Sequence, residues 1–425
     1  MKVKIISYSL SKGGAAKAAK NFLHLASKNK KYEAEMISVS GIIKNGVLFK
    51  SSKLSVFWHY SKMLVSRVLT YFILNDKSIK YSLNIFDSNY VLKHIRVEDG
   101  QREVIHINWV NNDTLSLFSL SKLFENKRKR IILTLHDEWF YCASEHYAKY
   151  NSLCYVTGYD DSNFINSYIF ELKKRINFEN VVITVPSYWL YERAKKSYLL
   201  SNCDIYILPN YIDTNIFTEL KDIRSKRYRI LDVPEDAFII GFGAVSGGAN
   251  PLKGFDLLVS ALDEVLSKIN DKARIVMVTF GANDIDKRVT SLGCHIINMG
   301  VISNSHNMAE IYNYLDVMIV PSRVESFGQV AAESLACKTP VIAFDYSGIK
   351  DIVTHQRSGL LAEPFSVDSL ALNINSFMNM TEKERYVYGE NGRDDVVRKF
   401  GETVVSEIYF KLIDYVRGDE YEKIK

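Results

Sequence analysis

The residues best suited to chemistry are two glutamates, Glu325 and Glu333, which lie eight positions apart. Apolar runs at 317–320 and 341–344 flank them and predict a strand–loop–helix–strand unit, with Glu325 in the loop and Glu333 in the helix. Ligands collect at the carboxyl ends of the strands in such units, where a helix N-terminus presents free N–H groups and partial positive charge. That environment favours phosphate, and two carboxylates in it indicate a ligand that also carries hydroxyl groups, as a nucleotide sugar does.

A lysine is the second candidate. A glycine-rich segment at 244–254 follows an apolar run at 239–244 and precedes a helical pattern, with Lys253 at the start of the helix. Its ammonium is suited to compensate the charge that a departing nucleoside diphosphate accumulates. A lone lysine at this position is otherwise an ordinary surface charge. The functional interpretation is favoured because Lys253 and Glu325 occupy corresponding loops of one predicted sheet.

Gly13 and Gly14 form a third candidate, between a predicted strand at 3–9 and a predicted helix at 17–26. Two glycines let the backbone approach a ligand closely at a helix start, although such a pair is as often a simple connecting turn. The segment lacks the Gly-x-Gly-x-x-Gly pattern, so a nicotinamide or flavin cofactor is not supported.

Runs of strand length alternate with helical patterns along both halves of the chain, which predicts an α/β class with parallel sheets and helices on both faces. The expected strands are 3–9, 104–108, 131–135, 181–185 and 205–208 in the first half, and 239–244, 274–280, 295–299, 317–320 and 341–344 in the second. We therefore expect two doubly wound domains, 1–212 and 213–404, joined through a polar hinge at 209–215. A terminal amphipathic helix is expected from Glu402 to Glu422.

The composition is that of a soluble globular protein, with 47% apolar and 24% charged residues among 425. This length suits two domains of ordinary size. The first ten residues have charges within an apolar stretch and read as a buried strand, not a signal peptide, and no run approaches the roughly 18 apolar residues of a membrane span. Five scattered cysteines form no disulfide framework, which agrees with a reducing compartment. A cytoplasmic location is expected.

The net charge of +5 conceals an asymmetry between the halves. Residues 1–210 hold 30 basic and 18 acidic residues, whereas the remainder holds 24 and 31. Within the basic half, Lys127-Arg128-Lys129-Arg130 and the aromatic, basic stretch 57–80 are either solvated surface or a docking surface for an anionic membrane that holds a lipid-linked acceptor. Nucleic acid is not expected as a partner, because no recognised binding motif accompanies the charge.

Several segments together resemble glycosyltransferase family 4, the retaining GT-B sugar transferases, over nearly the full length of the chain. The strongest are Glu-x7-Glu from Glu325 to Glu333 and Lys-Gly-Phe-Asp at 253–256. Further matching pieces are Val-Pro-Ser-Tyr-Trp-Leu at 185–190, Leu-Pro-Asn-Tyr-Ile-Asp at 208–213, Pro-Val-Ile-Ala-Phe-Asp at 340–345 and Ser-Gly-Leu-Leu-Ala at 358–362. Gly-Gly-Ala-Ala at 13–16 and Leu-His-Asp-Glu-Trp at 135–139 resemble the branch that builds bacterial surface polysaccharides of the O-antigen, lipopolysaccharide and colanic-acid type.

The resemblance implies a GT-B fold, in which two Rossmann-like domains face each other across a cleft and the C-terminal helix crosses back to the first domain. It implies retaining, metal-independent transfer of a hexose-type unit from a nucleotide diphosphate sugar to a hydroxyl of a saccharide, with no cofactor. The first domain, 1–212 with 405–425, would bind a lipid-linked acceptor, at the cytoplasmic face of the inner membrane. The second, 213–404, would bind the donor.

The resemblance also assigns roles to residues of the second domain. Glu333 would hold the ribose hydroxyls, and Lys253 the diphosphate. The donor sugar and distal phosphate would be held by Glu325, by Ser326 and by the backbone of Phe327, Gly328 and Gln329.

In the first domain, Gly13 and Gly14 would approach the diphosphate. His136, at the end of a strand, would face the transferred sugar or the acceptor and would join Lys253 and Glu325 as a catalytic residue. The alternative for His136 is a satisfied strand-end pair with Asp137.

The chain departs from the family pattern at two places. An arginine commonly stands five residues before the lysine, but Gly248 holds that position here, so neutralisation of the diphosphate rests on Lys253 alone or on an arginine from elsewhere. Relatives in the branch often have Gly-Cys-His-Tyr, where this chain has Glu145-His146-Tyr147.

Two other groupings raise the question of a metal. Cys142, His146 and Cys154 are three zinc-type ligands at loose spacing, too few for a structural site. Asp284-Ile285-Asp286 matches the Asp-x-Asp metal motif of the other glycosyltransferase architecture, but we interpret it as N-terminal charge on a helix. No metal is expected.

Two alternatives to the transferase remain open on the sequence. One is a GT-B hydrolase or epimerase that acts on the nucleotide sugar itself and needs no acceptor. The other is a catalytically silent scaffold that binds a nucleotide sugar or partner enzymes, for which the missing arginine is the support.

Overall fold

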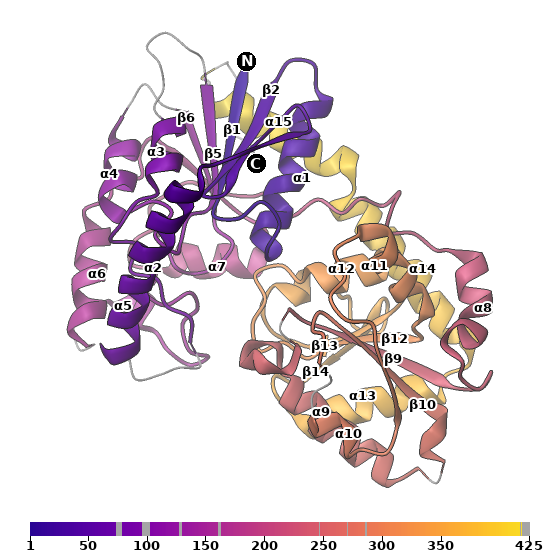
Figure 1. Ribbon diagram of the computed structural model, residues 1–425. Helices are drawn as coiled ribbons and strands as arrows, with labels where there is room; N and C mark the ends of the chain where they lie inside the picture. The colour runs from indigo at the N-terminus through magenta and orange to yellow at the C-terminus, as the bar shows by residue number, and fades with distance from the viewer. Residues whose placement is uncertain are drawn as a thin grey trace. The chain divides into compact units, whose positions relative to one another are not determined.

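The computed structural model describes residues 1–73, 79–95, 103–126, 130–159, 163–245, 247–269, 271–284, 287–416 and 418. The chain divides into two compact units, residues 1–211 with 405–425 and residues 212–404 (Figure 1). Each unit holds one sheet of mostly parallel strands between helices, which confirms the predicted α/β class with two Rossmann-like sheets. The acceptor-binding and donor-binding roles expected for the two parts stay predictions.

The first unit is built on an eight-stranded sheet in the order β4-β3-β2-β1-β5-β6-β7-β8. From β2 across β1 to β8, all neighbouring strands pair in parallel. The strands are β1 Lys2–Ser7, β2 Glu33–Ser38, β3 Gly41–Lys44, β4 Val47–Lys50, β5 Glu103–Trp109, β6 Arg130–Thr134, β7 Val181–Val185 and β8 Ile205–Ile207. All five strands expected in this half are present, and β2, β3 and β4 were not expected.

The antiparallel pair β3–β4 carries a turn signal that the search for apolar runs missed. Asn45 and Gly46 form a two-residue loop with φ of 51° and 76°, and Lys44 pairs directly with Val47. Positive φ at both positions is what a tight hairpin turn between twisted strands requires, and Asn-Gly is its strongest sequence signal. The hairpin extends the edge of the sheet beyond β2.

Helices cover both faces of this sheet because successive strand residues point to opposite sides. On β6, Ile131 and Leu133 join one buried cluster with α3, α4, α6 and α7, and Ile132 joins the other with α1 and α15. The helices are α1 Gly14–Lys28, α2 Lys53–Ile73, α3 Asn89–Ile95, α4 Leu117–Glu125, α5 Cys154–Thr157, α6 Phe164–Lys174, α7 Tyr188–Lys196 and α15 Glu402–Val416. Among the described residues, no helix is long and apolar enough to cross a membrane.

The last helix packs within the first unit. Val405, Tyr409, Leu412 and Ile413 of α15 are buried against β1, β2, β5 and α1. The Tyr409 hydroxyl lies 3.0 Å from Nδ1 of His106, a fully buried side chain of β5. The expected end of this helix at Glu422 lies outside the described residues.

The second unit is built on a six-stranded sheet in the order β11-β10-β9-β12-β13-β14, in which every pair is parallel. The strands are β9 Phe238–Gly243, β10 Ile275–Phe280, β11 His295–Asn298, β12 Val317–Val320, β13 Val341–Phe344 and β14 Gly359–Ala362. The α-helices are α8 Lys221–Leu231, α9 Phe255–Ser267, α10 Lys287–Thr290, α11 Ser305–Tyr314, α12 Gln329–Ala336, α13 Val367–Asn379 and α14 Glu382–Phe400. Helices α9 and α13 pack on one face of the sheet, and α11, α12 and α14 pack on the other.

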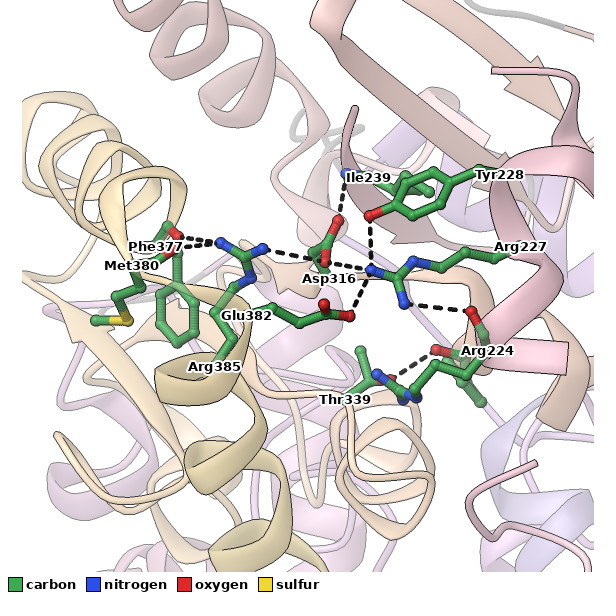
Figure 2. Close-up of polar contacts among 11 residues, drawn as sticks. Arg224, Arg227, Tyr228, Ile239, Asp316, Thr339, Phe377, Met380, Glu382 and Arg385 are labelled. Atoms are coloured by element: carbon green, nitrogen blue, oxygen red, sulfur yellow. Dashed lines mark hydrogen bonds and ion pairs between the residues drawn. The ribbon is translucent and has the colours of Figure 1, made fainter. Parts of the chain in front are cut away.

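A buried ion cluster joins α8 and α14 to the amino end of β12 (Figure 2). Asp316, directly before β12, accepts a hydrogen bond from the Ile239 amide at 2.8 Å and pairs with Arg227 at 3.3 Å and Arg385 at 3.5 Å. Burial raises the pKa of Asp316, while the two guanidinium groups favour its ionised form. Because loss of one partner would leave a buried charge uncompensated, we interpret the cluster as structural. It lies at the end of the sheet opposite to the loops that carry Lys253 and Glu325.

Candidate active site

The two loops that carry Lys253 and Glu325 leave neighbouring strands of one sheet. Strand β9 pairs with β10, the next strand in sequence, on one side. On its other side it pairs with β12, from which the sheet continues in the opposite direction to β13 and β14. The direction of winding therefore reverses between β9 and β12. Such a switch point, at the carboxyl ends of the strands, is where open α/β sheets bind ligands.

Lys253 and Glu325 form an ion pair between these two loops. Nζ of Lys253 donates to Oε1 of Glu325, which also accepts a hydrogen bond from the Ser322 hydroxyl at 2.9 Å. The side chains remain 28% and 19% exposed. The sequence predicted both residues at one site, and the structure brings them together as a cation and a carboxylate that solvent or a ligand can still reach.

A glycine makes the close approach of the two loops possible. Gly254 has φ of 65°, and a Cβ atom on it would lie 1.8 Å from the carbonyl oxygen of Pro321. Only glycine fits there, since any side chain would collide with backbone. The Gly of the Lys-Gly-Phe-Asp motif therefore sets the position of Lys253 against the Glu325 loop.

Arg323 fastens the same two loops from the other side, a role that the sequence reasoning missed. Its amide donates to the Leu252 carbonyl at 2.8 Å, and its guanidinium donates to the Pro251 carbonyl at 2.7 Å. The guanidinium also forms a bidentate pair with Asp256 at 2.8 and 2.6 Å. The hydrogen bonds of this pair lower the pKa of Asp256 and raise that of Arg323. The fork geometry of arginine is what holds carboxylate and carbonyl together.

The segment after Glu325 presents backbone groups at the start of α12. The Glu325 amide donates to the Ser347 hydroxyl at 3.0 Å, and its carbonyl accepts from the Gly348 amide at 2.8 Å, which fixes this loop. Gly328 precedes α12 with φ of 104°. The first N–H groups of the helix have no partner within it, so they can bind an anion.

Two side chains of this segment are buried. Ser326 is 7% exposed and Phe327 is 3% exposed, and the Phe327 ring packs edge-on against Phe400 at 5.1 Å. These two side chains therefore pack into the protein, and the donor contacts expected of the 326–328 backbone stay a prediction.

Glu333 is more enclosed than its predicted role suggests. It is 2% exposed, and its oxygens accept hydrogen bonds from the Tyr312 hydroxyl at 3.1 Å and from the Gln329 amide at 2.8 Å. The other side-chain atom of that amide, Oε1 of Gln329, is buried and makes no hydrogen bond with the described residues. To hold ribose hydroxyls, Glu333 would exchange the Gln329 amide for a ligand hydroxyl, and Oε1 of Gln329 would supply a second acceptor.

In the first unit, Gly13 and Gly14 end the loop after β1. Gly13 has φ of 90° and caps α1, which begins at Gly14, earlier than expected. A Cβ atom at either glycine would meet no heavy atom within 4 Å. The backbone here is therefore open to a ligand, as the prediction requires.

His136 follows β6 and lies beside the end of β5. Its Nε2 and Oδ1 of Asn108 are 2.9 Å apart. Burial lowers the pKa of His136 to about 4, so its imidazole is neutral near pH 7. A neutral imidazole can orient or accept a proton from a hydroxyl, but it brings no positive charge to a diphosphate.

Asp137 has other hydrogen-bond partners. Its carboxylate accepts from the Trp109 indole at 2.7 Å and lies 2.6 Å from Nδ1 of His146. His146 in turn lies 2.8 Å from the Ser82 hydroxyl. The hydrogen bonds of Asp137 thus join it to β5 and to His146.

The metal groupings raised by the sequence are not assembled in the described part of the chain, where no cluster of three or more His, Cys, Asp or Glu side chains could hold an ion. Cys142 is a buried free thiol whose pKa burial raises, and Cys154 is also free. Ile285 and Asp286 of the Asp-x-Asp stretch lie outside the described residues, as do Lys127 to Lys129 of the basic run. Independence from a metal stays a prediction.

An arginine from another part of the chain reaches the glycine-rich loop in which Gly248 replaces the arginine common in the family. Nη2 of Arg288, in α10, donates to the carbonyl of Gly248 at 3.0 Å. Its guanidinium lies 5.1 Å from the centre of the Phe255 ring, at the start of α9. Since Arg288 follows Lys253 by more than thirty positions, no local motif pointed to it.

Part of the chain matches a known protein family. Residues 232–395, which include Lys253, Glu325 and Glu333, match the family described as glycosyl transferases group 1. The two Rossmann-like sheets match the fold of solved GT-B glycosyltransferase structures. The match supports the predicted family, and the finer assignment to a surface-polysaccharide branch stays a prediction.

The chain is similar to glycosyltransferases and synthases with different names. A D-inositol 3-phosphate glycosyltransferase of Streptosporangium roseum is 33% identical over 162 residues, which covers 35% of this chain and 36% of that protein. The chain thus spans little more than a third of the length of this relative. An N-acetyl-alpha-D-glucosaminyl L-malate synthase of Bacillus anthracis is 26% identical over 340 residues, which covers 77% of this chain and 79% of that protein.

A solved structure matches nearly the whole chain. Anabaena HepE, in complex with UDP-glucose, superposes with a TM-score of 0.63 at 15% identity and covers 98% of this chain and 100% of its own. At this identity the likeness shows the fold alone.

Proposed function

We propose that this protein is a retaining glycosyltransferase that moves a hexose-type unit from a nucleotide diphosphate sugar to a hydroxyl of a lipid-linked bacterial surface glycan. The Lys253–Glu325 pair is the observation that carries the proposal. It lies at the switch point of a Rossmann-like sheet, within the region that matches group 1 glycosyltransferases. A nucleotide sugar as donor is supported by Anabaena HepE, which shares the fold and was solved in complex with UDP-glucose.

The residues divide the work between charge and hydroxyl groups. Lys253, the start of α12 and Arg288 would neutralise the diphosphate, and Arg288 would supply the cation that Gly248 lacks. Glu325 would hold hydroxyls of the transferred sugar, and Glu333 those of the ribose. Gly13 and Gly14 would let the first unit's backbone approach the diphosphate.

Because no residue is assigned as a nucleophile for a double displacement, retention would follow from attack of the acceptor on the face from which the nucleotide leaves. The bond from the anomeric carbon to the diphosphate oxygen breaks, and a bond from that carbon to the acceptor oxygen forms on the same face. The acceptor proton passes to the departing diphosphate oxygen. Lys253 and the helix start stabilise the charge that develops there, and electrostatic stabilisation of this kind is usually the largest catalytic effect.

The acceptor and location are the finer parts of the proposal. A lipid-linked saccharide would lie at the cytoplasmic face of the inner membrane, and the basic first half of the chain would approach that anionic surface. The relatives' names concern other acceptors, inositol phosphate and malate among them. The branch that builds surface polysaccharides is therefore supported only by the motifs at 13–16 and 135–139.

A screen of sugar nucleotides by thermal shift, followed by transfer to lipid-linked saccharides, tests the function. The proposal expects one donor to raise the melting temperature more than its bare nucleotide does, because the sugar adds contacts in the folded state. It also expects a product with the donor's anomeric configuration and unchanged turnover in EDTA. Free sugar or an epimer formed without acceptor would replace the transferase with a hydrolase or epimerase. Nucleotide binding without release on adding acceptors would favour a scaffold.

A further inference from the structure

Helix α2 lies on the outside of the first unit (Figure 1). Many of its large apolar side chains are exposed. Six of its large side chains are each more than half exposed: Leu54, Phe57, Trp58, Leu64, Tyr71 and Phe72. Single exposed apolar residues are common, but a continuous apolar helix face marks an interaction surface. We call these six residues the outer face of α2.

The opposite side of α2 is attached to the body of the unit. His59, Met63 and Ser66 follow each other at helical spacing and are buried. The sulfur of Met63 lies 3.9 Å from the Tyr8 hydroxyl, and Nζ of Lys62 donates to the Asp87 carbonyl at 3.1 Å. The helix therefore lies along the unit on a narrow, partly polar side, which reverses the usual arrangement of a surface helix.

The charged residues in the stretch of sequence that contains this helix have one sign, and the acidic residues that reach α2, Asp87 and Asp113, contact its attached side. Residues 36–75 contain five basic residues and no aspartate or glutamate. Two of these, Lys53 and Arg67, are exposed on α2. Helices that lie in the interface of an anionic bilayer combine Trp, Phe and Leu on one face with flanking Lys and Arg.

The segment that precedes α2 also has exposed apolar side chains beside a basic one. Edge strand β4 is exposed along its whole length, with Val47, Leu48 and Phe49 followed by Lys50. A protein partner would ordinarily carry charges of both signs on its rim and favour some acidic residues here. An extended anionic surface explains their absence over forty positions better.

We infer that the outer face of α2 docks this protein on an anionic lipid bilayer, with Trp58 and Phe57 in the headgroup region and Lys53 and Arg67 against lipid phosphates. The inference deepens the proposed function and rests on it for its purpose, because a lipid-linked acceptor lies in such a surface. The contact itself requires no catalysis, so it can be tested apart from transfer.

Flotation of the full chain with vesicles tests the docking. We expect the protein to float with phosphatidylcholine vesicles that contain phosphatidylglycerol and to stay behind with phosphatidylcholine alone, and salt should weaken the binding. Trp58 emission should shift to the blue on binding. Phe57→Ser with Trp58→Ser should lower the partition coefficient at least about tenfold, and Lys53→Glu with Arg67→Glu should do the same.

Matched controls separate docking from folding and from the proposed function. Phe118→Ser replaces an aromatic of α4 that is 67% exposed and should bind vesicles as the unchanged protein does. Each variant should keep its melting temperature and its thermal shift with the sugar nucleotide. Loss of that shift with intact flotation would contradict the proposed function alone.

Three outcomes would overturn the docking. The unchanged protein could fail to float with anionic vesicles, or the Phe57 and Trp58 variant could float as well as the Phe118 variant. The third is a dimer in sedimentation that dissociates on Phe57→Ser with Trp58→Ser and does not bind vesicles. That result would assign the outer face of α2 to a second copy of the chain.

Discussion

Lys253 and Glu325, which are 72 positions apart, form an ion pair between the loops that follow β9 and β12. Gly254 allows these loops to touch, and Arg323 holds them together. The pair places a cation and a carboxylate at the reversal point of the second sheet. A ligand with both phosphate and hydroxyl groups suits such a pair.

Arg323→Ala should raise the KM for the donor about tenfold and leave melting nearly unchanged. The substitution frees the Lys253 loop, whereas an exposed ion pair contributes at most about 1 kcal/mol to stability. Arg323→Lys should not rescue, because lysine lacks the fork that binds Asp256 and the Pro251 carbonyl together. Steady-state kinetics at varied donor concentration measures the effect.

Arg274→Ala is the matched control, since Arg274 is an exposed arginine of the same unit that pairs with Asp236 and Asp271. If Arg323→Ala behaved like Arg274→Ala in donor KM, Arg323 would have no positioning role.

Glu333→Gln should weaken the binding of nucleotides that carry ribose hydroxyls and should spare nucleotides that lack them. The amide cannot accept hydrogen bonds on both atoms, so a natural nucleotide should lose about tenfold in affinity, while its 2′,3′-dideoxy form should lose little. Calorimetry measures the affinity of both nucleotides for the unchanged protein and the variant, and the four values give the coupling energy between Glu333 and the ribose hydroxyls. Equal losses for the two nucleotides would mean that Glu333 supports α11 and α12 through Tyr312 and does not touch ribose.

Gly14→Ala should reduce transfer without reducing stability. A Cβ atom at Gly14 meets nothing within 4 Å and the backbone is not left-handed, so the fold accepts it. If Gly14 has its proposed role, the methyl group would obstruct the approach of the diphosphate. Gly13→Ala should cost about 1–3 kcal/mol of folding free energy, because φ of 90° with ψ of 166° is a conformation essentially limited to glycine. Transfer rates and thermal melts of the two variants distinguish ligand approach from a connecting turn, for which Gly14→Ala would be fully active.

Stability of the first unit should fall in acid through His106. Burial lowers the pKa of His106 to about 3, so the folded state keeps the neutral ring while the unfolded chain takes up a proton below its ordinary pKa, about 6.5. The contribution is complete above about pH 6.5 and is lost as the pH falls toward 3, by up to about 1.4 kcal/mol per pH unit. His106→Gln should reduce that slope in denaturant titrations by the part that His106 contributes, while the part from the buried His136 remains. His24→Gln, on the exposed side of α1, should leave it in place.

The sheets were predictable from sequence because buried parallel strands are short apolar runs, as at 181–185, 317–320 and 341–344. The β3–β4 hairpin was missed although Val47-Leu48-Phe49 is a short apolar run and Asn45-Gly46 marks the turn; strand β4 lies at the sheet edge and is exposed along its length. Lys253 and Glu325 could be placed together because corresponding loops of one sheet end at the same edge.

The remaining features of the site depend on contacts between segments far apart in sequence. Arg323 acts on a loop more than sixty positions earlier, and Arg288 reaches Gly248 from α10. The burial of Glu333 against Tyr312 follows from the packing of α11 on α12, which no spacing of residues encodes. The sequence shows that these side chains can form hydrogen bonds and ion pairs, but it does not show which residues they contact.

The most direct test of the central claim is the transfer rate of Lys253→Ala with the donor found by thermal shift. The account predicts a fall in kcat of about a hundredfold or more, because the variant removes charge stabilisation of the departing diphosphate. It also predicts little change in melting, since the pair with Glu325 is partly exposed. Lys268→Ala, which breaks an exposed pair with Glu264 on α9, is the control and should be fully active. Full transfer activity in a folded Lys253→Ala protein would contradict the assignment of the diphosphate site.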